Sequence, residues 1–356
     1  MNTNPVYKDH RHALPGPDDI TRKELPNGII VLSRPNFNSP TLSIKGYIHS
    51  GCYFDPDEKL GLGYLTAHGL MNGTLNHDFQ SLYNEIESVG ARLSFSAGTL
   101  TTAFSAHCLS EDLTLILNLI AESLRTPTFP EKEFNRQKTQ LLTGLAIRAQ
   151  DTAAMAALIF DQIIYAGHPY ERPEEGYTET VQRITREDII NFYQQTYGPR
   201  KMVVVVVGAV EPYAAVNAVS EALGDWHNPS QRTLPEIPEA QSIQNTSQKT
   251  LSIPGKAQAD IVLGSLAPER LSPDYHDHWA ANRLTVGGGY SDRDHLCLAG
   301  HRQMGVRCYP GAGLSGGSKR DAAHRVDLCV RQLVGRCVLC LPGSADPLRL
   351  RLIWQK

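Results

Sequence analysis

The run Val203–Val207, five consecutive valines inside KMVVVVVGAV, constrains the fold of this 356-residue chain more than any other stretch. Side chains branched at Cβ lose rotamer freedom in a helix and pack well on a pleated sheet, so the run predicts a fully buried strand. Helical patterns flank it, because Thr185 and Asp188 form a capping pattern and residues 211–226 are amphipathic. A buried strand between such helices indicates an α+β domain whose sheet is covered by helices.

The residues before the valine run alternate between strand-like and helical periods. Residues 24–50 place apolar side chains at every second position, residues 58–71 change to a helical period, and residues 91–108 predict a hairpin of two strands. Ser110 is expected to cap the helix that follows this hairpin. Helices are predicted over 76–90, 112–124, 131–150, 152–166 and 188–198.

A second, shorter copy of this order follows a segment rich in Pro, Ser, Gln and Asn. The strand-like run 249–268 is succeeded by 273–289, which predicts a helical stretch ending in glycines. Too few residues remain for a complete copy, so the second domain is expected to be incomplete. The predicted organisation is a loose N-terminal arm (1–19), a first domain (20–226), a linker (227–247), the start of a second homologous domain (248–290) and an atypical tail (291–356).

Composition changes abruptly near residue 290. Eighteen glutamates lie at or before Glu269 and none lies after it, whereas five of the seven cysteines fall in the last sixty residues and arginine displaces lysine there. Cysteine-rich, arginine-rich sequence without glutamate is typical of a GC-rich gene read out of frame, so we interpret the tail as a product of a frameshift. The alternative is a zinc knuckle, with ligands drawn from His324, Cys329, Cys337 and Cys340.

Overall charge and cysteine use limit the functional classes. The formal net charge of −3 provides no basic field for nucleic acid. Residues 1–19 hold no apolar run, which predicts neither a secretory signal nor a membrane span. An odd number of cysteines without disulfide spacing in the first 290 residues favours the reducing cytoplasm.

Three segments resemble the pitrilysin/insulinase family, in the branch of the mitochondrial processing peptidase and its bacterial relatives. They are LPNGIIVLSRPN (25–36), SGCYFDPDEKLGLGYLTAHGLMNGT (50–74) and the stretch from Gly167 to Val210 that begins GHPYERPEEGYTET. The resemblance covers roughly residues 20–290 and implies tandem αβ domains facing each other around a proteolytic chamber. Active members bind zinc through an inverted motif, H-x-x-E-H, with a further Glu on a later long helix.

Aligned on Gly73-Thr74, the resemblance places the first zinc ligand at Tyr64, the general base at Ala67 and the second ligand at His68. The third ligand falls near Gly144 or Leu145, and an upstream acidic position of the family falls near Gln137. Of these only His68 matches the motif, so no catalytic or metal residue is predicted in this chain. Tyr64 and His68 are expected to pack the helix against the sheet.

Weaker substrate-binding candidates follow from the same resemblance. Ser94 and Ser96 lie on the strand that corresponds to the substrate-pairing edge of the family, which needs only its backbone. The glycines Gly287, Gly288 and Gly289 form a candidate loop against substrate. Arg302 and Tyr309 match, in type and separation, an Arg and a Tyr with which partner subunits bind substrate. His276 and His278, two apart in a helical pattern, are expected on the surface.

These observations predict a catalytically inactive subunit that pairs, as a heterodimer, with an active zinc-bearing subunit of the family and binds a peptide or protein substrate. Zinc is expected only in that partner, and no other cofactor, nucleic acid or membrane is expected. The alternatives are an active zinc metalloendopeptidase with an atypical motif and a purely structural scaffold.

Overall fold

A computed structural model describes seven ranges of the chain: 16–241, 245–256, 259–266, 281–288, 297–300, 337–340 and 351–354. The chain divides into two compact units, Met1–Arg302 and Gln303–Lys356, which are described separately. Within the second unit the described residues form one antiparallel hairpin, β10 (Cys337–Cys340) with β11 (Arg351–Trp354).

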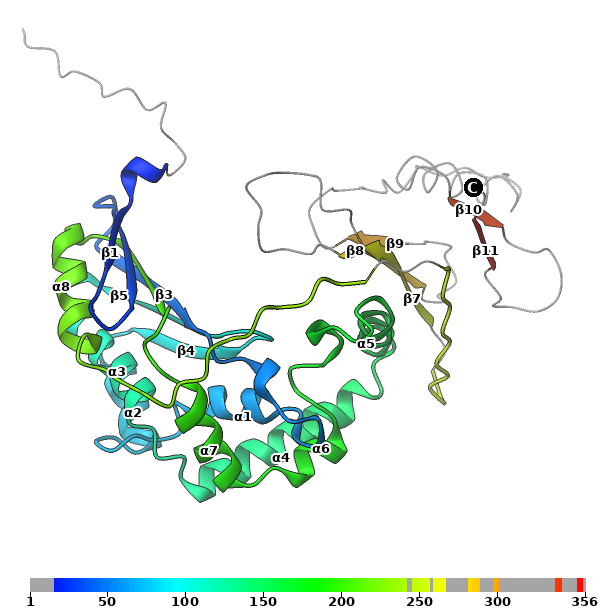
Figure 1. The fold of residues 1–356 in the computed structure, drawn as a ribbon, viewed down its shortest axis with the longest axis horizontal. Coiled ribbons are helices and arrows are strands. Elements are labelled where there is room, and N and C mark those ends of the chain that lie inside the picture. Colours follow the sequence, from blue (N-terminus) through cyan, green and yellow to red (C-terminus); the bar gives the residue numbers. More distant parts are fainter. Residues whose placement is uncertain are drawn as a thin grey trace, which may run out of the picture. The chain divides into compact units, whose positions relative to one another are not determined.

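The first unit is built on a six-stranded sheet with helices on one face (Figure 1). Its strands are β1 (Thr21–Glu24), β2 (Ile30–Pro35), β3 (Thr41–Ile48), β4 (Arg92–Ala97), β5 (Thr102–Leu109) and β6 (Val203–Gly208). Its helices are α1 (Leu62–Gly69), α2 (Phe79–Ser88), α3 (Leu113–Arg125), α4 (Glu131–Arg148), α5 (Thr152–Ile164), α6 (Thr178–Arg183), α7 (Arg186–Thr196) and α8 (Pro212–Leu223). The mixture confirms the predicted α+β class.

The sheet has the order β1-β2-β6-β3-β5-β4, so the valine strand β6 lies inside it and β4 lies at one edge. β6 runs parallel to β2 and antiparallel to β3. The prediction that β6 is fully buried is wrong in one respect. Val204 and Val206 are buried under the helices, whereas Val203, Val205 and Val207 are half-buried on the other face. The same alternation on β3 leaves Lys45 and Tyr47 exposed, so one face of the sheet remains accessible.

Two expected helix caps have different outcomes. Thr185 caps α7 as predicted, because its hydroxyl accepts from the Asp188 amide and the Asp188 carboxylate accepts from the Thr185 amide. Ser110 is not the cap of α3. It begins a short 3₁₀ turn, Ser110–Asp112, and α3 starts after that turn without a side-chain cap. The extra turn pairs the Leu113 amide with the Ser110 carbonyl, so the serine hydroxyl is not needed for that amide.

The first part of the predicted linker is bound to the first domain. The Asn228 side chain donates to the carbonyl oxygens of Gln194 and Tyr197, at 2.8 Å and 2.6 Å. Gln231, 4% exposed, accepts from the Arg200 amide at 3.0 Å. Ala240 is buried in a small apolar cluster with residues of α5. Residues 228–232 and 240 are therefore held in place by specific contacts, in contrast to a free tether.

The segment predicted to begin a second domain also packs on α5. Strand β7 (Ala259–Leu266) brings Val262 against the α5 cluster, and the Thr152 hydroxyl donates to the Asp260 carboxylate. β7 pairs with β8 (Ala281–Gly288), which pairs with β9 (Cys297–Gly300). The helical stretch predicted over 273–289 is thus wrong from Ala281 onward. Its last part alternates apolar and polar residues, and the pairing with β7 favours a strand. Among the described residues, no helix has the length and apolar character needed to cross a membrane.

Candidate functional site

Helix α1 carries three of the four positions that the sequence assigned to a former zinc site. The helix begins after Gly61, whose φ of 98° is accessible to glycine at little cost. The buried carboxylate of Asp55 accepts hydrogen bonds from the amides of Gly61 at 2.9 Å and Gly63 at 2.8 Å. Burial raises the pKa of Asp55 to about 7, against the opposing effect of these amides. Asp55 therefore anchors the start of the helix that holds the site.

Tyr64 and His68, at the two former ligand positions, contact each other. Their rings stack with centroids 4.1 Å apart and planes inclined by 26°. His68 Nδ1 lies 2.9 Å from the Tyr64 carbonyl oxygen, which can only accept, so Nδ1 carries the hydrogen and Nε2 is the ring nitrogen left for a ligand. Burial, with help from the Glu175 carboxylate, raises the pKa of the Tyr64 phenol. A phenol that holds its proton at neutral pH is a poor zinc ligand, and the half-buried Tyr64 packs against the apolar core.

The position of the general base is closed. Ala67 has no exposed surface, and its methyl group can neither accept a proton nor hold a water molecule. Leu65 beside it is equally inaccessible and belongs to the apolar core. The helix is therefore fixed to the domain by apolar packing.

Helix α4 carries the fourth position, near Gly144 or Leu145, and also the upstream position at Gln137. Gln137 bridges to α1, because its Nε2 donates to the Leu65 carbonyl at 3.0 Å and its Oε1 accepts from Asn72 Nδ2 at 2.7 Å. Gly144 lies two turns further along the same side of α4, and a Cβ built there meets no atom within 4 Å. Leu145 is buried in the core. Of the two candidates for the third ligand, Gly144 is the one that faces open space.

These residues do not fit a zinc ion. A catalytic zinc site requires three protein ligands and an open position for water. Here the first ligand position holds the protonated phenol of Tyr64, the second offers one imidazole nitrogen of His68, and the third, at Gly144, has no side chain. Across the part of the chain that the structure describes, no group of three or more His, Cys, Asp or Glu side chains is arranged to hold a metal.

The Gln137 bridge is expected to stabilise the domain. Gln137→Ala removes the donor to the Leu65 carbonyl and the acceptor for the buried Asn72 amide, which should lower the free energy of unfolding by about 2 kcal/mol. Gln140→Ala, at an exposed position of the same helix, is the matched control and should change it by less than about 0.5 kcal/mol. Urea unfolding of both variants measures the difference. Equal losses would show that the bridge contributes nothing.

Ser94 and Ser96 are exposed on β4, the edge strand of the sheet. β4 pairs with β5 on one side, with Ser94 opposite Ser105 and Ser96 opposite Ala103. The hairpin closes with a bond from the Gly98 amide to the Thr101 carbonyl, at 2.8 Å. Because an antiparallel ladder alternates, the backbone groups of Leu93, Phe95 and Ala97 point away from β5. The edge has backbone donors and acceptors available for another strand.

Sequence reasoning missed the side chains that share a face with Ser94 and Ser96. Lys45 and Tyr47 on β3, and Ser105 on β5, line a shallow pocket together with these serines. A signal was present, since Lys45 and Tyr47 alternate with Leu42, Ile44 and Ile48 in TLSIKGYI. That alternation does not tell which strands are neighbours in the sheet. The sequence alone therefore did not show that these side chains lie together.

The remaining candidates lie elsewhere. Gly287 and Gly288, expected in a substrate-contacting loop, are instead the last residues of β8, opposite Asp260 and Ala259. The regular pairing of the strand requires no loop there. Several candidate positions lie outside the described residues: Gly289, Arg302, Tyr309, His276, His278, His324 and Cys329, as do the N-terminal arm through residue 15 and most of the tail. The strand β10 contains Cys337 and Cys340, but its side chains are also outside the described part.

Comparisons with known proteins agree with the expected family. Residues 30–173 match the family described as Insulinase (Peptidase family M16), and residues 183–294 match the Peptidase M16 inactive domain. A crystal structure of a peptidase M16 inactive domain from Pseudomonas fluorescens superposes with a TM-score of 0.63 at 23% identity, covering 72% of this chain and 61% of that chain. At this identity the superposition shows a shared fold.

Two curated relatives are similar to part of the chain. The probable mitochondrial-processing peptidase subunit beta of Arabidopsis thaliana is 27% identical over 218 residues, which are 61% of this chain and 41% of the relative. Subunit 1 of the mitochondrial cytochrome b-c1 complex of Mus musculus is 26% identical over 190 residues, which are 52% of this chain and 39% of the relative. The chain thus spans about two fifths of the length of these relatives.

Proposed function

The chain belongs to the insulinase family of peptidases (M16), and on that premise we propose that it is a catalytically inactive subunit of a bacterial processing-peptidase-like complex. In this role it contributes substrate binding and one wall of the chamber to an active, zinc-bearing partner of the same family. One observation carries the proposal. The zinc positions hold Tyr64, Ala67 and Gly144, yet the helix that bears the first two keeps its Asp55 anchor and its packing.

The edge strand β4 supports the substrate-binding part of the proposal. Its outward backbone groups at Leu93, Phe95 and Ala97 allow an extended peptide to add as a further strand. Such pairing uses main-chain hydrogen bonds, so it does not depend on the lost zinc ligands. A subunit can therefore lose catalysis and still bind a substrate segment.

The similarity to proteins named as subunits supports the partner. One relative is a subunit of a processing peptidase and the other a subunit of a respiratory complex.

We also propose a cytoplasmic location. Cys52 and Cys108 are the two cysteines whose side chains the structure describes. Both are free thiols, which a reducing compartment favours.

Reconstitution tests the proposal. The chain is purified alone and together with a family member from the same genome that has an intact H-x-x-E-H motif, and bound zinc and peptide cleavage are measured for each sample. Alone it should hold no stoichiometric zinc and cleave nothing. In the complex it should raise kcat/KM at least tenfold over the partner alone. One tightly bound zinc per isolated chain with EDTA-sensitive cleavage would overturn the proposal in favour of an active enzyme.

A variant at the edge strand separates substrate binding from assembly. Ala97→Pro removes an outward amide of β4 without touching the bonds to β5, and Ala97→Ser is the matched control. The proline variant should still assemble but should raise KM several-fold for the complex. In another outcome, the complex forms with the wild-type chain and with both variants, while none of them changes the cleavage rate of the partner. That result would favour a structural scaffold, the role that similarity to a cytochrome b-c1 complex subunit suggests.

A further inference from the structure

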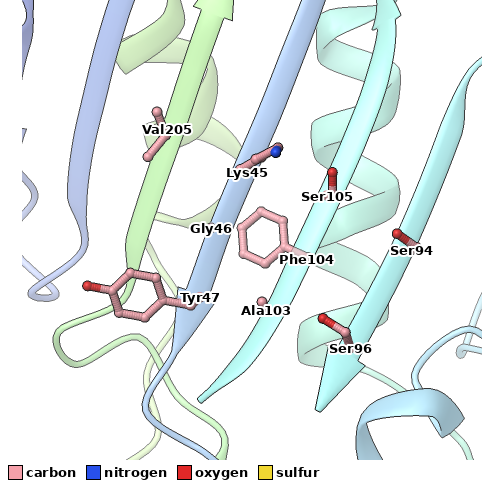
Figure 2. A pocket seen from close by; sticks show the side chains of 9 residues that line it. All are labelled: Lys45, Gly46, Tyr47, Ser94, Ser96, Ala103, Phe104, Ser105 and Val205. Carbon is pink, nitrogen blue, oxygen red and sulfur yellow. The ribbon is translucent and has the colours of Figure 1, made fainter. Parts of the chain in front are cut away.

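A shallow pocket opens on the accessible face of the sheet, beside the edge strand (Figure 2). Polar side chains of three strands line it: Lys45 and Tyr47 from β3, Ser105 from β5, and Ser94 and Ser96 from β4. The pocket also includes Gly46 and the Phe104 ring. A Cβ at Gly46 would lie 2.3 Å from that ring, so Phe104 fills the space that a side chain would take. The Phe104 ring is buried, and the three strands pair with one another along the pocket.

Strand register arranges the pocket as a lane that runs from the edge to Lys45. Ser94 lies opposite Ser105, and Ser105 lies opposite Lys45. The neighbouring row contains Ser96, Ala103 and Tyr47 in the same order. Serine and alanine are short, so nothing bulky stands between the edge of β4 and the Lys45 ammonium. In Figure 2 the Lys45 side chain extends toward Ser105 along this lane.

The charge of the lane is positive. None of the residues that line the pocket is acidic. Arg92 and His107, a cross-strand pair exposed on the same face, lie next to it at the end of β4. The serine hydroxyls add hydrogen-bond donors. A carboxylate placed in this lane would meet a cation and donors without meeting a like charge.

The distances select the length of the side chain. Strands lie about 4.8 Å apart, so a strand added to β4 lies about 14 Å from β3. A lysine side chain spans roughly 6 Å and a glutamate side chain roughly 4 Å, and a charge-assisted bond adds about 2.8 Å. With both side chains fully extended along the lane, about 4 Å remains between a glutamate carboxylate and the Lys45 ammonium, which is too long for a hydrogen bond but short enough for charge attraction. The shorter aspartate leaves about 5 Å, so its attraction is weaker.

We propose that this pocket recognises a glutamate side chain of a peptide added to β4, and that Lys45 is the residue that determines this specificity. The inference rests on the proposed substrate binding at β4 and names its substrate class: extended segments with glutamate at alternate positions, on the side of the open sheet face. Aspartate, glutamine and lysine at those positions bind less well.

Fluorescence anisotropy with the full chain tests this. Four labelled nine-residue peptides with blocked ends alternate threonine with glutamate, aspartate, glutamine or lysine, so every second strand register presents the variable side chains to the face. The glutamate peptide should bind about fivefold more tightly than the glutamine peptide, as expected for one partly exposed ion pair of about 1 kcal/mol. The preference should shrink as the salt concentration rises.

Charge reversal assigns the preference to Lys45. In Lys45→Glu the order should invert, with the lysine peptide binding more tightly than the glutamate peptide, while Lys45→Met should abolish the difference. Lys23→Glu, which reverses an exposed lysine on β1 at the opposite edge of the sheet, is the matched control and should leave the order unchanged. Circular dichroism melts confirm that all variants are folded.

The outcomes separate this inference from the proposed function. Binding of all four peptides with equal affinity, or an unchanged order in Lys45→Glu, would overturn the specificity while leaving peptide binding at β4 intact. No binding of any peptide would remove both, because then β4 accepts no strand in this chain. A glutamate preference that also disappears in Lys23→Glu would show an effect of net charge and would overturn the assignment to Lys45.

Discussion

The full-length chain carrying Tyr64→His and Ala67→Glu is expected to bind zinc weakly and to cleave no peptide. These changes restore the H-x-x-E-H sequence on α1, but they supply only two protein ligands where a catalytic zinc needs three. The new glutamate also enters a position with no exposed surface, so its ionised carboxylate should lower the free energy of unfolding by about 3 kcal/mol. Metal analysis, a peptide-cleavage assay and urea unfolding measure the three quantities.

Whether a third zinc ligand can be restored is expected to depend on which side of α4 carries it. Adding Gly144→Glu to the double variant puts a carboxylate into open space on the side of α4 that faces α1, and this triple variant should bind one zinc per chain. Zinc should then recover part of the lost stability by mass action. The matched triple with Leu145→Glu should fold poorly and bind no zinc, because Leu145 is part of the core. Strong hydrolysis by the double variant would show that the third ligand lies elsewhere.

Much of the first domain was predictable because its signals are local. The capping pattern at Thr185, the helical periods of α3 to α5 and the hairpin that becomes β4 and β5 depend on neighbours within a few residues. The assignment of β4 to an edge came from the family resemblance, and the strand order agrees with it. The lack of zinc-donor side chains at the motif positions could also be predicted from the sequence, because the ability to donate to a metal is a property of the residue type.

What remained hidden depends on contacts between distant segments. The valines of β6 predict a fully buried strand. Only one face of β6 is buried, because the helices cover only that face of the sheet. Gly144 and Leu145 are adjacent in sequence but lie on different sides of α4. Gly144 faces open space, whereas Leu145 is buried. The lane to Lys45 requires the register of three strands, two of which are separated from β3 by more than forty residues. Periodicity indicates two faces of a strand but not what lies across from each.

The anchor of α1 should be the most sensitive single position outside the core. Asp55→Ala removes the acceptor for two buried amides, those of Gly61 and Gly63, and should lower the free energy of unfolding by about 3 kcal/mol. Asp55→Asn keeps one oxygen acceptor and should lose about half as much at pH 8. Urea unfolding followed by circular dichroism gives both values. The exposed Glu58→Ala, a few residues along the same loop, is the control and should be nearly neutral.

The pH dependence of the Asp55→Ala loss tests the electrostatics of the anchor. Because burial raises the folded pKa of Asp55 to about 7, above its unfolded value near 3.8, the folded state holds the proton more tightly. Its contribution to stability is then fully present below about pH 4 and is lost as the pH rises through 7. The loss in Asp55→Ala should therefore be larger at pH 5 than at pH 8, while the difference between Asp55→Asn and Asp55→Ala should stay constant, because neither variant titrates at this position. A loss that grows from pH 5 to pH 8 would mean that the two amides outweigh burial and hold the carboxylate ionised.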